Sequence, residues 1–94
     1  MKPVRAKLML MMEILVALRD GPVIKNHLAL VCNINFGRIG ELLDQLERKG
    51  LIVRKTVKDS PDQYSLTEAG MKVSMSYQWI NSLVMGDDDN SVKR

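Results

Sequence analysis

The sequence has few of the residues that build disulfides or metal sites, and no long apolar run. Cys32 and His27 are the one cysteine and the one histidine among 94 residues, so there is no internal disulfide and no cluster of soft metal ligands. No apolar run approaches the roughly 20 residues needed to cross a bilayer, and charges interrupt Met1–Met12 too often for a secretory signal. We expect a soluble intracellular protein without a metal or cofactor.

The composition is that of one folded domain. Hydrophobic residues make up 46% and charged residues 27% of the 94 residues, which is ordinary for a globular protein with one core. Residues 86–94 hold three aspartates, one lysine and one arginine, a balance of −1; because the whole chain carries +3, residues 1–85 carry +4. We expect a domain over residues 1–85 that weakly favours acidic partners, followed by a disordered acidic and polar tail, 86–94.

A first helix is predicted from Val4 to Leu18, with Pro3 in its opening turn. Apolar side chains recur at spacings of three and four, as on the buried face of a helix; they are Leu8, Met11, Met12, Leu15 and Leu18. The segment Asp20-Gly21-Pro22 ends the helix, because glycine favours a left-handed cap and proline cannot continue the hydrogen-bond ladder. Residues 23–24 are then suited to a very short strand.

Two further helices follow, only a few residues apart. Asn26 is expected to cap a second helix of about two turns that ends near Asn33. Its buried side chains would be Leu28, Val31 and Cys32. Asn35 is expected to cap a third helix that ends at Gly50. The third helix has one apolar arc, formed by Ile39, Leu42, Leu43 and Leu46.

From Leu51 onward the pattern becomes extended. Residues 51–55 and 63–66 have strand-forming side chains and flank Asp59-Ser60-Pro61-Asp62, which predicts a two-stranded hairpin. Thr67 then caps a last helix, 67–85, which ends before Gly86 and three aspartates. The order helix, short strand, helix, helix, hairpin, helix is that of a winged helix-turn-helix, mainly helical with a small hairpin.

Three short motifs support this fold. They are Asn33-Ile34-Asn35-Phe36, Gly50-Leu51-Ile52 and Tyr64-Ser65-Leu66-Thr67-Glu68-Ala69-Gly70. In this order and spacing they resemble the small archaeal winged helix-turn-helix proteins that are predicted transcriptional regulators, and the resemblance covers residues 9–84. It implies that the third helix enters the DNA major groove, that the second helix braces it, and that the hairpin wing lies along the phosphates.

The outer face of the third helix carries the candidate base contacts. The base readers would be Asn35, Arg38 and Gln45. Glu41 either accepts from a cytosine amino group or is simply solvated. Gly37 and Gly40 either allow a phosphate or a protein to approach the backbone closely or are tolerated surface glycines. Phe36 either staples the turn to the core or stacks on a sugar-phosphate backbone.

The third helix is electrostatically neutral, so DNA affinity would have to come from other segments. Its cations are Arg38, Arg48 and Lys49, and its anions are Glu41, Asp44 and Glu47. Other cations cluster around the wing, at the start of the second helix and at the amino end; these are Arg54, Lys55, Lys58, Lys25, Lys2, Arg5 and Lys7. They either contact phosphates or keep a small protein soluble. For DNA binding, we expect the wing cations to share one exposed surface with the third helix.

The last helix is apolar on two sides. One row is Met71, Met75, Trp79 and Leu83, and the other is Val73, Tyr77, Ile80 and Val84. One row suffices for the core of a small domain, and a helix with a second row generally has another partner. We expect a homodimer through the first row, with help from the first helix, and two DNA half-sites about 34 Å apart. In the alternative, both rows pack into one core.

No catalytic arrangement emerges, so we do not expect an enzyme. His27 stands alone, Cys32 suits core packing, and no lysine or hydroxyl follows the helix-three glycines as in a phosphate-cradling loop. Two hypotheses remain. The first is double-stranded DNA binding by a homodimer, as a cytoplasmic, nucleoid-associated transcriptional regulator or small chromatin protein. The second is a winged-helix module that docks another protein with the outer face of its third helix. The sequence indicates no particular effector.

Overall fold

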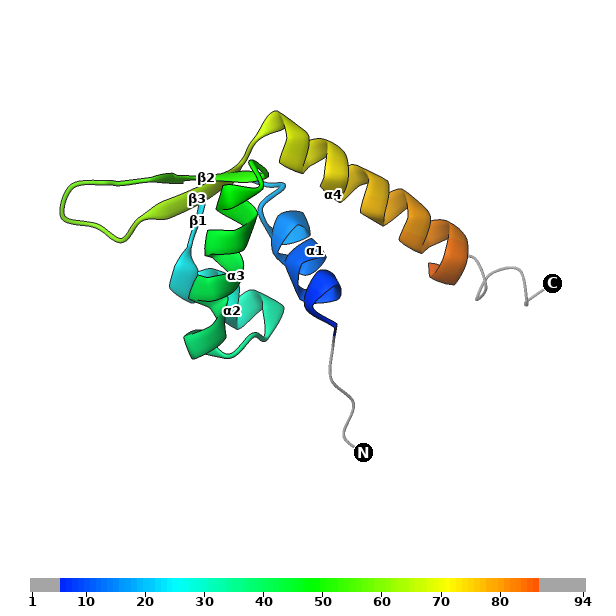
Figure 1. Ribbon diagram of the computed structural model, residues 1–94, viewed down its shortest axis with the longest axis horizontal. Coiled ribbons are helices and arrows are strands. Elements are labelled where there is room, and N and C mark those ends of the chain that lie inside the picture. The colour runs from blue at the N-terminus through cyan, green and yellow to red at the C-terminus, as the bar shows by residue number, and fades with distance from the viewer. Residues whose placement is uncertain (1–5, 87–94) are drawn as a thin grey trace.

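A computed structural model describes residues 6–86 of the chain (Figure 1). Its elements are α1 (Lys7–Ala17), β1 (Val23–Ile24), α2 (Lys25–Cys32), α3 (Phe36–Arg48), β2 (Ile52–Lys55), β3 (Gln63–Leu66), α4 (Glu68–Asn81) and a π-helical turn, η1 (Ser82–Gly86). The predicted order of elements is therefore confirmed. Pro3, Lys2, Arg5 and residues 87–94 of the predicted tail lie outside the described residues.

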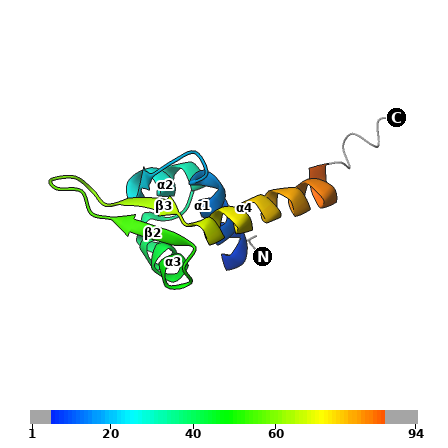
Figure 2. The same ribbon diagram turned by 90° about the horizontal axis from the view of Figure 1, so that it is seen from above.

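The three strands form one antiparallel sheet in the order β1-β3-β2. The short strand β1 extends the predicted hairpin by pairing Val23 with Tyr64, and β2 pairs Ile52 with Leu66. The tip of the hairpin and the far end of α4 project from the three-helix body in opposite directions, as both views show (Figures 1 and 2). This is the predicted winged-helix fold, with the wing at one end and the last helix at the other.

The hydrophobic core lies between α1, α2, α3 and the sheet. All four members of the predicted arc on α3 are buried, with Ile39, Leu43 and Leu46 completely inaccessible to solvent. From α1 the core receives Leu10, Met11, Ile14, Leu15 and Leu18. The burial of this arc fixes the rotation of α3 about its axis, so the opposite side of the helix faces outward.

Three predictions about α1 and α2 were wrong. Leu8 is 65% exposed and Val31 is 57% exposed, while Ile14 and Ala29 are buried. A spacing of three and four does not decide which of two neighbouring arcs faces the core, and packing against the other helices selects these arcs. Asn26 does not cap α2, because Ile24 is the extended N-cap residue and the helix begins at Lys25.

The ends of two elements also differ from prediction. Helix α1 begins at Lys7, because Ala6 has extended backbone angles, and the predicted start at Val4 lies outside the described residues. The last helix is α-helical only from Glu68 to Asn81 and then widens into the π-helical turn.

The C-cap residue of α1 is Leu18 and not Gly21, whereas the predicted caps at Asn35, Thr67 and Gly50 are confirmed. Asn35 Oδ1 accepts a hydrogen bond from the Gly37 N–H at 2.7 Å, at the start of α3. Thr67 Oγ1 accepts from the Gly70 N–H at 3.0 Å and donates to the Gly50 carbonyl oxygen at 2.7 Å. Gly50 has a φ of +76°, the left-handed conformation that lets the chain leave α3 and enter β2. Thr67 thus joins the start of α4 to the end of α3.

We expect Thr67→Ala to lower the free energy of unfolding by about 1–2 kcal/mol, because it removes both hydrogen bonds of the hydroxyl. Urea denaturation followed by far-UV circular dichroism measures the change. Thr67→Ser is the matched control, since it keeps the hydroxyl and should stay within about 0.5 kcal/mol of the wild type. Equal losses in the alanine and serine variants would contradict this role of the hydroxyl.

Candidate nucleic-acid interface

The turn between α2 and α3 sets the orientation of the candidate recognition helix. Asn33 adopts the left-handed conformation with a φ of 55°, and the N–H of the buried Ile34 donates to the Ala29 carbonyl at 2.9 Å. The chain therefore reverses within three residues and enters α3 at its Asn35 cap. With the leucine arc facing inward, an outer face remains exposed at Gly37, Arg38, Glu41 and Asp44, while Gln45 is half-buried at its border.

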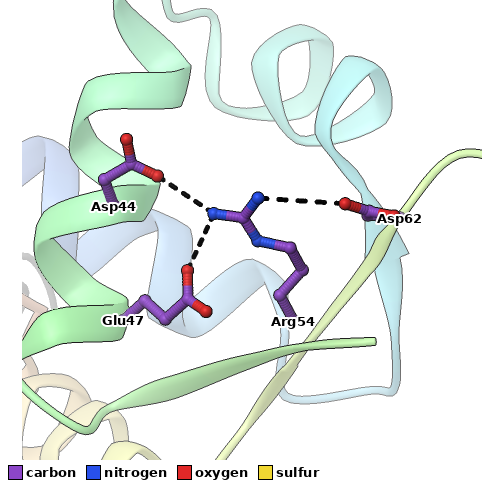
Figure 3. Close-up of polar contacts among 4 residues, drawn as sticks. All are labelled: Asp44, Glu47, Arg54 and Asp62. Atoms are coloured by element: carbon purple, nitrogen blue, oxygen red, sulfur yellow. Dashed lines mark hydrogen bonds and ion pairs between the residues drawn. The ribbon is translucent and has the colours of Figure 1, made fainter. Parts of the chain in front are cut away.

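The guanidinium of Arg54, on β2, lies against two acids of α3 (Figure 3). Its Nη2 donates to Asp44 Oδ1 at 3.1 Å and to Glu47 Oε1 at 2.9 Å, and its Nη1 lies 3.9 Å from Oδ2 of Asp62, just before β3. The hydrogen bond to Glu47 and the charges of Glu47 and Asp44 raise the pKa of Arg54 further above its ordinary value. Two of the three α3 acids, Asp44 and Glu47, thus have an intramolecular partner.

The aromatic ring of Tyr64 lies against the guanidinium of Arg54. Its ring centroid lies 5.6 Å from the Arg54 guanidinium carbon, within cation–π range. Burial raises the pKa of the Tyr64 phenol, so the ring stays neutral under the cation. Arg54 is therefore paired with three carboxylates and lies against an aromatic ring. These contacts fix the orientation of its side chain.

The wing cations were expected to lie on one exposed surface with α3. They do not all lie there. Arg54 is opposite Tyr64 in the sheet and shares with it and with Ile52 the face that packs toward α3. Because side chains alternate along a strand, Lys55 lies on the other face of β2. Lys58 is exposed in the loop at the tip of the hairpin. The wing thus presents Lys55 and Lys58 to solvent and turns Arg54 toward α3.

Phe36 lies outside the core, so the structure does not use it as a staple. Its side chain is 57% exposed at the first turn of α3. The Lys25 ammonium lies 5.3 Å from the ring centroid, which brings two predicted contact residues together. The start of α2 and the start of α3 therefore form one cationic and aromatic corner beside the outer face of α3.

Gly37 and Gly40 differ in their surroundings. A Cβ at Gly37 would lie 3.1 Å from the capping Asn35 Oδ1, whereas a Cβ at Gly40 would meet no atom within 4 Å. Nothing inside the domain therefore requires a glycine at position 40. The hypotheses of a close external partner and of a tolerated glycine both remain for this position.

The predicted dimerisation residues lie on an unusually apolar part of the surface. Met75, Trp79 and Leu83 are 52%, 65% and 53% exposed, and Met71 is half-buried nearer the domain. On another side of α4, an open groove of about 510 Å³ runs between α4 and α1. Its apolar lining includes Leu8, Met9, Met12, Val73, Tyr77 and Ile80. The two rows on α4 therefore do not both pack into the core, although Val73 packs against it.

Neither a metal site nor a membrane span is present in residues 6–86. No group of three or more histidine, cysteine, aspartate or glutamate side chains gathers there as a candidate metal site. No described helix is long and apolar enough to cross a bilayer.

The fold and this surface define a winged helix-turn-helix protein. The family model for the winged helix-turn-helix matches residues 4–84, and the chain belongs to that family. Among solved structures, the apo form of a ZitR variant from Lactococcus lactis is similar, with a TM-score of 0.81 and 16% identity over 93% of this chain and 67% of that one. A MarR variant from E. coli complexed with operator DNA has a TM-score of 0.73 and 17% identity over 83% of this chain and 58% of that one.

A further similar structure is the transcriptional regulator BldR from Sulfolobus solfataricus, with a TM-score of 0.69 and 23% identity over 81% of this chain and 60% of that one. The chain thus spans about three fifths to two thirds of the length of these three proteins. At these identities the likeness is one of fold. No protein of curated function matches the sequence.

Proposed function

We propose that this chain binds double-stranded DNA as a homodimer and acts as a transcriptional regulator or a small chromatin-associated protein. In this proposal α3 lies in the major groove and the wing lies along the phosphates. The observation that carries it is the exposed outer face of α3, on which two of the three acids, Asp44 and Glu47, are ion-paired with Arg54. The pairing with Arg54 offsets part of the negative charge of these acids and so lowers the repulsion of a polyanion.

The proposed contacts fall into base readers and phosphate contacts. On α3, Arg38 suits guanine, Gln45 suits adenine, and Glu41 suits the amino group of cytosine. The residues at the start of the helix, Asn35, Phe36 and Gly37, would lie close to the backbone, where helix N-termini favour phosphates. Phosphate contacts would come from Lys25, Lys55 and Lys58. The likeness in fold to the DNA-bound MarR variant supports this arrangement.

The proposed dimer uses the apolar surface of α4. Contiguous exposed apolar side chains on a small domain mark an interaction site, and Trp79, Met75 and Leu83 are each more than half exposed. A second copy of the chain is the proposed occupant, because a two-fold pair would present two α3 helices to successive turns of one duplex.

Protein docking through the outer face of α3 is the competing function. The acids Glu41, Asp44 and Glu47 on this face would favour a protein partner with positive charge. Arg54 already supplies that partner to Asp44 and Glu47, so only Glu41 among these three lacks an ion pair in the described structure. The structure therefore favours DNA over an external protein.

A salt titration of duplex binding tests the proposal. We expect the dissociation constant of the wild type to rise steeply with salt. The double variant Lys55→Ala with Lys58→Ala should bind at least about tenfold more weakly. It should also reduce the slope of log K against log salt by about 1.8, the value for two lost phosphate contacts. Fluorescence anisotropy with labelled random duplexes measures both quantities.

The matched control is Lys7→Ala with Lys72→Ala, which removes the same charge from α1 and α4. This pair should change affinity by less than about threefold, because charges beyond a Debye length are screened. Absence of duplex binding by the wild type at low salt would overturn the proposal and favour protein docking. Equal losses in the two lysine pairs would show that net charge, and not the wing, controls binding.

A further inference from the structure

The Arg54 cluster, formed by Arg54, Asp44, Glu47 and Asp62, connects the wing to α3. Arg54 comes from the middle of β2, Asp44 and Glu47 lie three residues apart on α3, and Asp62 lies just before β3 (Figure 3). One guanidinium therefore touches both strands of the wing and the recognition helix. Among the ion pairs that the described residues form, this is the one that joins the wing to α3.

Two features separate the cluster from an ordinary stabilising salt bridge. The four side chains are between 36% and 54% exposed, so water screens their attraction and the gain in folding stability is small. The same exposure places Asp44 and Glu47 on the side of α3 that a duplex would approach. Their charges therefore matter more for a polyanionic partner than for the fold.

Arg54 is poorly placed for a phosphate of its own. Nη2 is shared between Asp44 and Glu47, Nη1 points to Asp62, and the Tyr64 ring lies under the guanidinium. A phosphate oxygen that approached the remaining N–H groups would come close to the carboxylates of Asp44, Glu47 and Asp62, which would repel it. A guanidinium is suited to this bridging position because its two terminal nitrogens face different partners, Nη2 the acids of α3 and Nη1 Asp62, whereas an ammonium offers a single nitrogen.

We propose that Arg54 is a positioning residue of the interface, an inference that rests on the proposed DNA binding. It masks Asp44 and Glu47 from the duplex and holds the wing at a fixed distance from α3, without contacting DNA itself. The acids of α3 are in turn the anchor that keeps the wing in place, which explains why a helix that approaches phosphates carries them.

The test compares duplex affinity of the full chain with four variants at low salt. We expect Arg54→Ala to weaken binding about tenfold or more, because it exposes two acids to the phosphates. Adding Asp44→Asn and Glu47→Gln to Arg54→Ala should restore affinity to within about threefold of the wild type, with the wild-type salt slope. Arg54→Lys should recover only part of the affinity, since it restores the charge but offers a single nitrogen.

A charge-matched control separates masking from net charge. Arg54→Ala with Asp20→Asn and Glu68→Gln has the same net charge as the rescued triple variant, but its neutralised acids lie outside α3 and the wing. This variant should bind as weakly as Arg54→Ala. Thermal unfolding by circular dichroism should show that Arg54→Ala folds, with a melting temperature within about 8 °C of the wild type, as for the loss of exposed ion pairs.

The outcomes are distinguishable. If Arg54 contacts a phosphate, the triple variant stays weak and its salt slope falls by about 0.9, which overturns the inference while the proposed function stands. Equal rescue by the charge-matched control, or no loss in Arg54→Ala, also overturns it. A wild type that does not bind duplex overturns the proposed function and this inference together.

Discussion

Gly70→Ala is expected to destabilise the domain by about 3 kcal/mol or more, a large part of the roughly 5–15 kcal/mol that keeps a small domain folded. A Cβ at Gly70 would lie 2.0 Å from the Leu51 carbonyl oxygen, 3.0 Å from the Leu51 carbonyl carbon and 3.1 Å from Leu66 Cδ2. The Leu51 carbonyl is held in place, because it accepts from the Thr67 N–H at 3.1 Å. Relief of the clash requires the start of α4 to move away from the start of β2.

Differential scanning calorimetry measures the effect, which corresponds to a fall in melting temperature of at least about 12 °C. Gly40→Ala is the matched control, because no atom lies within 4 Å of a Cβ there. In the interior of α3 it should instead stabilise the fold by about 1 kcal/mol. A Gly70→Ala variant as stable as the wild type would contradict the close contact between α4 and β2.

The Gly40→Ala control also bears on the interface. If α3 needs a bare backbone at Gly40 to approach its partner, this variant will be more stable than the wild type and will bind duplex less well. If the glycine is merely tolerated on the surface, stability rises and affinity stays the same. The two hypotheses left open for this position are thus separated by one anisotropy titration.

Trp79→Glu is expected to dissociate the proposed homodimer. It places a charge at the most exposed large side chain of the apolar row on α4, where Trp79 is 65% exposed in the single chain. Loss of a central tryptophan anchor costs about 2 kcal/mol or more, so the dimer dissociation constant should rise at least about 30-fold. Analytical ultracentrifugation over a range of concentrations measures the change.

Leu30→Glu on α2 is the matched control, because Leu30 is 78% exposed and lies outside the α4 surface. It should leave the dimer intact. Ile80→Glu tests whether the groove between α1 and α4 takes part, since Ile80 lines that groove. A wild type that sediments as a monomer at all concentrations would contradict the dimer.

The chain's single tryptophan provides an independent readout. If the dimer buries Trp79, its fluorescence should shift to shorter wavelength as concentration rises, and duplex affinity should fall about 100-fold or more when Trp79→Glu separates the two binding modules. Loss of the dimer with unchanged duplex affinity would show that one domain binds DNA alone.

The sequence by itself determined the order of the elements and most of their ends. The apolar arc on α3, the caps at Asn35 and Thr67 and the turn at Gly50 depend on side chains within a few residues of one another. Such local patterns can be recognised in the sequence without knowledge of how the rest of the chain folds. The winged-helix fold could therefore be predicted, because its identity depends on this order.

Tertiary structure decided which side of each element meets which neighbour. The spacing of apolar residues did not exclude Leu8 from the core, and nothing in the sequence paired Arg54 with Asp44 and Glu47. Those pairs depend on the rotation of α3, fixed by its leucine arc, and on the strand register, which turns Arg54 inward and Lys55 outward. Periodicity gives a segment its shape, whereas the contacts between segments follow from how those shapes pack together.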